Sequence, residues 1–175
     1  DSFDIHGGGQ DLVFPHHENE IAQSKCAYNG HFAKYWMHNG FIQIEGNKMS
    51  KSLGNFFLLR EILDKFSGNV IRLFILSTHY RKPINFSFEN MEDSKKALQN
   101  ITSSMKRYEE LILKFEKEID NIKIKKDIKE ISEFYDKLEK YDKKFIDAME
   151  EDMNTPQALA TIFDQIRETN KYIDN

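Results

Sequence analysis

Cysteine is almost absent from this sequence, since Cys26 is the one cysteine among 175 residues. An internal disulfide is therefore excluded, and we expect a reducing, cytoplasmic environment. Long apolar runs are also missing, because none approaches the roughly 20 residues that a membrane helix needs. The first residues lack the basic start and the apolar stretch of a secretory signal. We therefore expect no association with a membrane.

An excess of positive charge is missing as well. The 25 basic and 29 acidic residues give a net charge of -4. A protein that grips nucleic acid over its whole surface is usually basic, so any contact with RNA must be local or lie outside this sequence. Residues 145–175 contain two basic and seven acidic side chains, so this segment is poorly suited to bind the phosphates of a nucleic acid. The balance of 39% hydrophobic and 31% charged residues is typical of a globular protein.

The part of the chain up to about residue 90 contains all six histidines and the motif-like stretches. Apolar alternation there predicts short strands, and apolar residues at helical spacing predict helices. Alternating strands and helices indicate an α/β layer. The expected strands cover residues 3–6, 35–38 and 41–44, and the expected helices run from Pro15 to about Tyr28, over 56–66 and over 69–78. Glycines 7–9 should form a turn or loop, and 46–54 a polar loop.

The rest of the chain is predicted to be all helical. An amphipathic stripe runs from Glu89 to about Phe115, and a last helix should open with Thr155 as its cap and Pro156 at its first position. Residues 114–144 contain ten lysines and nine acids, which indicates solvated helix faces and not a basic stripe. The composition shift predicts a boundary between domains 1–88 and 89–175.

Glycines follow the first expected strand in the stretch from His6 to Asp11. Such glycines let a backbone approach a ligand closely, and an acid just beyond them can bind a ribose hydroxyl. The stretch is neither a GxGxxG fingerprint nor a P-loop. A flexible loop without a ligand is the alternative.

A pair of candidate metal ligands lies at the start of the first helix. His16 and Glu20 are one turn apart there, so both can face one zinc ion. Two ligands do not complete a zinc site, however. Alternatively, Glu18 and Glu20 only complement the positive end of the helix dipole. Cys26, further along the same helix, is predicted to be buried.

Two lysines, Lys48 and Lys51, stand three residues apart in a loop of small polar residues. Such a loop can fold over a polyphosphate and neutralise charge on departing pyrophosphate. An ordinary exposed Lys/Ser loop is the alternative.

Residues 48–52 read KMSKS in full and resemble the signature loop of class I aminoacyl-tRNA synthetases. Residues 4–20, DIHGGGQDLVFPHHENE, narrow the match, because they resemble the cysteinyl-tRNA synthetases. Residues 37–40, 85–90 and 147–158 are similar to the same family. The resemblance spans almost the whole chain, in the family's order.

The resemblance implies an α/β fold: the second half of a class I Rossmann-like catalytic domain with the KMSKS loop and stem-contact region. An all-α helical bundle domain on the tRNA-binding side follows. It also implies that cysteine is activated with ATP to cysteinyl-adenylate and transferred to tRNA(Cys). Lys48 and Lys51 correspond to catalytic positions. The positions that contact ATP or the adenylate are His6, Gly7, Gly8, Gly9, Asp11, Met49, Ser50 and Lys51.

The family's zinc ion binds the cysteine substrate, and its His and Glu ligands match His16 and Glu20. Its two Cys ligands and its HIGH-like motif have no counterpart here, and we expect them upstream. The 175 residues alone should therefore be inactive. Magnesium is expected to accompany ATP, and the protein should be a monomer.

Two other functions remain open at this point. A cysteine:amino-sugar ligase would share the catalytic head, although it has less need of the helical tail around residues 154–156. A non-catalytic synthetase-derived binding module would fit the missing upstream motifs. Against this second alternative, the sequence keeps the residues that a decayed catalytic ancestor would be expected to lose, namely Lys48, Lys51, His16 and Glu20.

Overall fold

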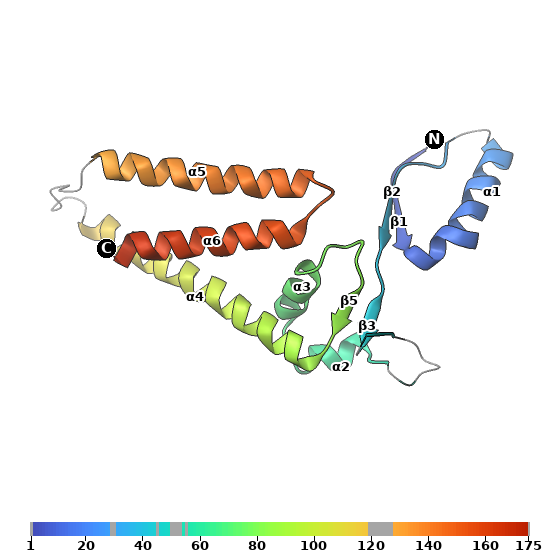
Figure 1. Cartoon of the computed structure of the whole chain (residues 1–175), viewed down its shortest axis with the longest axis horizontal. Helices are drawn as coiled ribbons and strands as arrows, with labels where there is room; N and C mark the ends of the chain where they lie inside the picture. The colour runs from blue at the N-terminus through green and yellow to red at the C-terminus, as the bar shows by residue number, and fades with distance from the viewer. Residues whose placement is uncertain are drawn as a thin grey trace. The chain divides into compact units, whose positions relative to one another are not determined.

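The computed structural model describes residues 2–28, 31–44, 46–49, 54, 56–118 and 128–174 (Figure 1). The chain forms two compact units. The first comprises residues 1–65 and 78–88, and the second comprises 66–77 and 89–175. No helix of the described ranges is long and apolar enough to cross a membrane.

The first unit begins with a strand–helix–strand motif. Strand β1 (Phe3–Gly9) pairs in parallel with β2 (Ala33–Asn39), and α1 (Glu18–Tyr28) connects them. A 3-10 turn (Gln10–Leu12) and a wide helical turn (Val13–His17) lead from β1 into α1. The expected strands and the end of the expected helix at Tyr28 are confirmed. The predicted turn at Gly7–Gly9 is wrong, because these glycines continue β1 and pair with Met37, His38 and Asn39.

The first unit also holds a second, three-stranded sheet in the order β4-β3-β5. Strand β3 (Ile42–Ile44) pairs antiparallel with β4 (Asn47–Lys48) and parallel with β5 (Ile84–Phe86). Part of the predicted polar loop is thus a short strand. Helix α2 (Leu59–Leu63) is shorter than predicted. Rings of Phe57, Phe86 and Phe88 pack within 5.6–5.8 Å of one another and support this sheet.

The second unit is helical, with α3 (Gly68–Leu76), α4 (Phe88–Glu118), α5 (Ile128–Glu150) and α6 (Thr155–Asp174). Helices α5 and α6 lie side by side (Figure 1). The rings of Phe134 and Tyr172 stack between them, 3.9 Å apart. Tyr108 on α4 donates a hydrogen bond to the Ile166 carbonyl of α6, at 3.2 Å. Met91 is fully buried, so apolar packing holds this unit together.

Two local predictions are corrected by the structure. Asn154, not Thr155, caps α6, because its side-chain oxygen accepts a 3.3 Å hydrogen bond from the Gln157 N–H. Thr155 is the first helical residue. Cys26, predicted to be buried, is exposed. The reason is that α1 has no buried residue, so it does not bury a stripe of its own.

Candidate functional site

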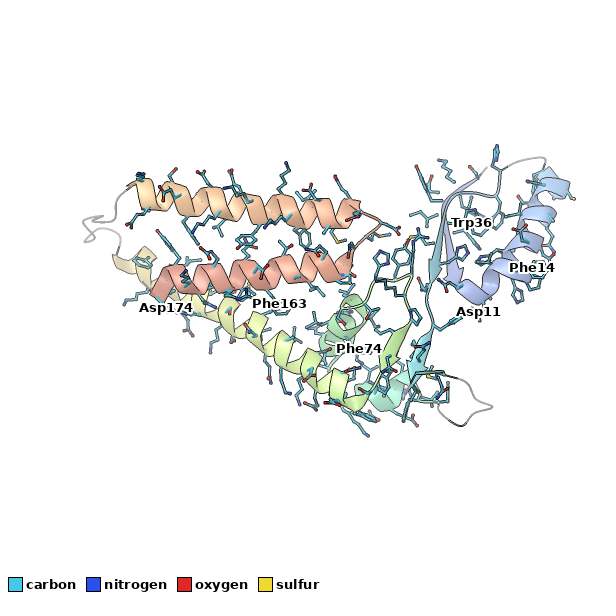
Figure 2. All side chains as sticks on the ribbon, viewed as in Figure 1. Asp11, Phe14, Trp36, Phe74, Phe163 and Asp174 are labelled. Carbon is cyan, nitrogen blue, oxygen red and sulfur yellow. The ribbon has the colours of Figure 1, made fainter. Side chains whose placement is uncertain are left out.

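A cluster of histidines lies between the parallel strands β1 and β2 and the segment that connects them. His6 comes from β1, His38 from β2, and His17 from the wide turn before α1. Trp36 of β2 packs against all three rings, with centroids 4.9 Å from His6, 5.1 Å from His17 and 5.9 Å from His38. Figure 2 shows the Trp36 side chain among these elements. These ring contacts restrict the orientation of each imidazole.

His17 and His38 form the buried side of this cluster. His17 is only 5% exposed, and its Nδ1 lies 2.9 Å from His38 Nε2, so one ring donates a hydrogen bond to the other. Burial lowers the pKa of His38 below its usual value, and the positive fields of His17, Arg81 and His6 lower it further. Gly8 makes room for His17, since a Cβ at this position would come within 3.0 Å of the imidazole. Gly8 in β1 therefore serves close packing.

His6 and Glu20 form the other side of the cluster. His6 Nε2 lies 2.9 Å from Glu20 Oε2. The Oε2 atom is buried, yet the geometry of this contact is not that of a hydrogen bond. The distance describes an ion pair when His6 is protonated, whereas the poor angle leaves a carboxylate lone pair unsatisfied. This buried oxygen is a candidate ligand for a cation.

The donor atoms of His6, His17 and Glu20 all lie within 4.8 Å of one another. Imidazole nitrogens and a carboxylate oxygen are donors that zinc accepts, and the unsatisfied Glu20 oxygen adds to that fit. Zinc prefers four ligands and often takes thiolates. Cys26 does not belong to the group. The residues fit a zinc ion that takes its remaining ligands from elsewhere.

Only some of the predicted site residues lie in the histidine cluster. His6, Gly8 and Glu20 belong to the cluster, whereas His16 is exposed and lies outside the three-residue group. The wide turn places the neighbouring His17 inside, with the Glu18 N–H bonded to the carbonyls of Pro15 and Val13. That His16 and Glu20 bind a metal stays a prediction.

The remaining predicted residues lie further along the first unit. Asp11 is exposed just beyond β1, Lys48 lies in β4, and the Met49 N–H donates a 3.0 Å hydrogen bond to the Ile42 carbonyl. Ser50 and Lys51 lie outside the described residues. Their predicted contacts with ATP remain predictions.

Sequence reasoning missed the inward roles of His17 and His38. A signal for His38 was present, because Trp36 and His38 are two residues apart in an expected strand and so share a face. For His17 no such signal existed, since the ideal helical spacing favoured His16. Only the irregular turn decides which imidazole is buried.

Comparison with known proteins identifies the class of this fold. A model of the family described as the tRNA synthetases class I (C) catalytic domain matches residues 1–96, and a DALR domain model matches residues 144–175. The chain therefore belongs to the class I tRNA synthetases of the (C) catalytic-domain family.

Relatives narrow the comparison to one kind of synthetase. The cysteine–tRNA ligase of Fusobacterium nucleatum is 53% identical over 99% of this chain and 35% of its own length. That of Carboxydothermus hydrogenoformans is 47% identical over 99% of this chain and 35% of its own length. The resemblance to cysteinyl-tRNA synthetases is confirmed. The chain spans about a third of the length of these relatives.

Solved structures show the same fold at low sequence identity. The LeuRS of Agrobacterium radiobacter K84, in a ternary complex with tRNA and LeuAMS, aligns with a TM-score of 0.70 at 19% identity. The alignment covers 94% of this chain and 22% of that one. The methionyl-tRNA synthetase of Mycobacterium tuberculosis, in complex with methionyl-adenylate, also gives 0.70, at 16% identity over 98% of this chain and 34% of that one.

Proposed function

We propose that a full-length protein containing this chain is a cysteine–tRNA ligase. It activates cysteine with ATP to cysteinyl-adenylate and then transfers the cysteinyl group to the terminal ribose of tRNA(Cys). The observation that carries this proposal is the identity of about half of all residues with cysteine–tRNA ligases over almost the whole chain. The match to the DALR domain model favours tRNA over an amino sugar as the acceptor of the cysteinyl group.

The finer architecture follows from the same proposal. Residues 1–88 form the second half of a Rossmann-like catalytic domain with the KMSKS loop and the stem-contact region. Residues 89–175 form a helical bundle on the tRNA-binding side. The strand–helix–strand motif of β1, α1 and β2 and the helices α4, α5 and α6 support this division. Residues 66–77, which contain α3, depart from it, because they belong to the helical unit.

Activation depends on Lys48 and Lys51 in this proposal. Two ammonium groups neutralise the negative charge that develops as pyrophosphate leaves the α-phosphate, and magnesium bound to ATP shares this role. Met49 and Ser50 complete the loop beside the nucleotide. Gly7, Gly8, Gly9 and Asp11 contact adenosine and its ribose, and His6 lies near the adenylate.

Selection of cysteine depends on a zinc ion in this proposal. His16 and Glu20 would hold the ion together with two cysteines that this chain does not supply. A bound zinc ion would supply affinity for a thiolate, which would separate cysteine from serine, a pair that cavity shape alone separates poorly. The buried, unsatisfied Glu20 oxygen supports this role. The donor atoms of His6 and His17 lie within 4.8 Å of the Glu20 carboxylate, so both imidazoles would lie beside the ion.

The proposed setting is that of a monomeric enzyme of the cytoplasm with cysteine, ATP and tRNA(Cys) as its partners. Cys26 has no second cysteine to pair with in this sequence, and a free thiol is typical of a reducing compartment.

Cysteine-dependent ATP–pyrophosphate exchange by the full-length protein tests the proposal. Lys51→Ala should lower the exchange rate by about 10²–10³-fold, the usual loss for one well-placed electrostatic group. Lys34→Ala is the matched control, because Lys34 is an exposed lysine paired with Asp4 in the first unit. Absence of exchange in a folded, zinc-loaded wild type would contradict the enzyme reading and favour a non-catalytic binding module.

A further inference from the structure

A tight turn over residues 79–82 is fastened to the carboxyl ends of both β1 and β2. It closes with a 2.8 Å hydrogen bond from the Lys82 N–H to the His79 carbonyl. The Gly40 N–H, just past β2, donates to the Tyr80 carbonyl at 2.7 Å. The Gln10 side chain, just past β1, donates to the Arg81 carbonyl at 3.0 Å. Three hydrogen bonds therefore fix a loop that could otherwise move freely.

The turn is also packed too closely against Gly40 for any other residue there. A Cβ on Gly40 would lie 2.2 Å from the Lys82 carbonyl oxygen and 2.3 Å from its carbon. Both are backbone atoms, which cannot rotate away as a side chain can. The position of the turn at the strand ends is thus built into the fold.

Two of the four side chains of this turn, Arg81 and Lys82, are basic. The His79 and Tyr80 rings stack with centroids 4.9 Å apart, and the Arg81 guanidinium lies over the Tyr80 ring at 5.3 Å. Such stacking limits the conformational freedom of the guanidinium. Arg81 and Lys82 are both exposed.

Local charge sets this segment apart from the acidic chain as a whole. No aspartate or glutamate occurs between Asp64 and Glu89, whereas the net charge of the chain is -4. The field of Arg81 reaches His38 of the histidine cluster and contributes to lowering its pKa. The basic turn is therefore an electrostatic neighbour of the candidate site. Ligands of open parallel sheets bind at the carboxyl ends of the strands, where this turn is fastened.

We propose that the turn over residues 79–82 binds the phosphate backbone of the single-stranded end of the nucleic-acid acceptor, with Arg81 and Lys82 donating to phosphate oxygens. This inference rests on the proposed function and names the element that holds the acceptor at the site. An arginine fork matches phosphate geometry, and lysine adds a point charge. A fixed turn gains more from such contacts than a mobile loop, because less freedom is lost on binding.

Phosphate could also come from ATP, so the experiment separates the two sources. It uses the full-length protein, its tRNA, and the variants Arg81→Gln, Lys82→Gln and Lys34→Ala. The last removes a positive charge at the opposite, amino-terminal end of β2 and serves as the control. The readouts are direct tRNA binding at several salt concentrations and tRNA-independent ATP–pyrophosphate exchange.

We expect Arg81→Gln to weaken tRNA binding on the order of 10-fold, the loss for one charge-assisted contact. The slope of log affinity against log salt should fall by about one for each lost phosphate contact. Pyrophosphate exchange should stay within about two-fold of wild type, as for any group that contacts only the acceptor. Arg81→Lys should restore the salt slope and part of the affinity, because it keeps the charge and loses the fork. Gly40→Ala, which displaces the turn, should weaken tRNA binding in the same direction.

Two results would overturn this inference. The first is that Arg81→Gln and Lys82→Gln bind tRNA with the same affinity and the same salt dependence as the control Lys34→Ala. The other is an equal loss of pyrophosphate exchange and tRNA binding, which would assign the turn to ATP. Both differ from failure of the proposed function, in which the wild type itself shows no cysteine-dependent exchange.

Discussion

The two units of this chain are held together by different interactions. In the helical unit, most of the buried side chains are apolar, among them Val70, Leu73, Met91, Ala148 and Ala158. In the strand-bearing unit, large apolar side chains such as Phe3, Ile5 and Tyr35 are exposed, and the most buried residue of its candidate site is a histidine. Rings and hydrogen bonds orient the site, whereas close packing stabilises the helices. Substitutions should therefore affect chemistry in one unit and stability in the other.

Metal binding should show the largest effect in the strand-bearing unit. Glu20→Gln and His16→Ala each remove a proposed zinc ligand. Loss of a residue that only supports a ligand typically lowers metal affinity about 10–100-fold, so we expect these two variants to lower the zinc affinity of the full-length protein by more than that. His17→Ala should stay within that range. Zinc content after dialysis against a graded chelator measures this.

The order of these variants decides which histidine is the ligand. A larger loss for His17→Ala than for His16→Ala would contradict the proposed ligand pair. It would assign the metal to the group of His6, His17 and Glu20.

Met91→Ala should give the largest loss of stability in the helical unit. Its side chain is fully buried, so truncation leaves a cavity that costs about 2–5 kcal/mol. Urea unfolding of the 175-residue chain followed by circular dichroism at the helix band measures it, while fluorescence of Trp36, the one tryptophan of this sequence, reports on the histidine cluster. Met105→Ala, at a position 53% exposed on the same helix, is the control. Equal shifts of both signals would contradict the distinction between the units.

The cap of α6 should give a smaller loss. Asn154→Ala removes the acceptor of the Gln157 N–H and should cost about 1 kcal/mol of unfolding free energy. Thr155→Ala, one residue later, should cost less, because Asn154 provides the cap. Thermal unfolding measures the loss of stability in both variants. A larger loss for Thr155→Ala than for Asn154→Ala would show that Thr155 is the cap.

The smallest effect should be a pH dependence in the strand-bearing unit. Burial and nearby positive groups lower the pKa of His38, so the unfolded chain takes up a proton more readily than the folded one. Stability should therefore fall as the pH drops through the ordinary histidine range toward the lowered value. Unfolding of wild type and His38→Gln between about pH 5 and 8 measures this. An unchanged pH profile in the variant would show that another group titrates.

Local sequence predicted the order of helices and strands well. It failed where the conformation of a segment depends on pairing with a segment far away in the chain. The strand at β1, the end of α1 at Tyr28 and the start of α6 near Thr155 follow from alternation, a helix stop and helical spacing. Local sequence predicts a turn or loop at the glycine run, because the pairing of these residues with β2, some thirty residues away, leaves no local signal. Strand β5 was missed for the same reason, since its partner β3 lies about forty residues earlier.

The candidate site shows the same limit at the level of side chains. The sequence points to Glu20 because it lies one helical turn after His16 in the expected helix. His17 was passed over because the wide turn before α1 departs from ideal helical geometry. Cys26 was expected inside on residue type alone, but burial depends on which face of α1 is covered. Motifs locate a site, and tertiary structure determines which of their side chains point inward.

Charging of tRNA(Cys) by the full-length protein, with cysteine and serine offered in parallel, tests the central claim most directly. The account predicts cysteinyl-tRNA from the wild type, no detectable seryl-tRNA, and loss of charging in Lys51→Ala but not in Lys34→Ala. Cysteine activation without any transfer to tRNA, or equal charging with serine, would contradict it.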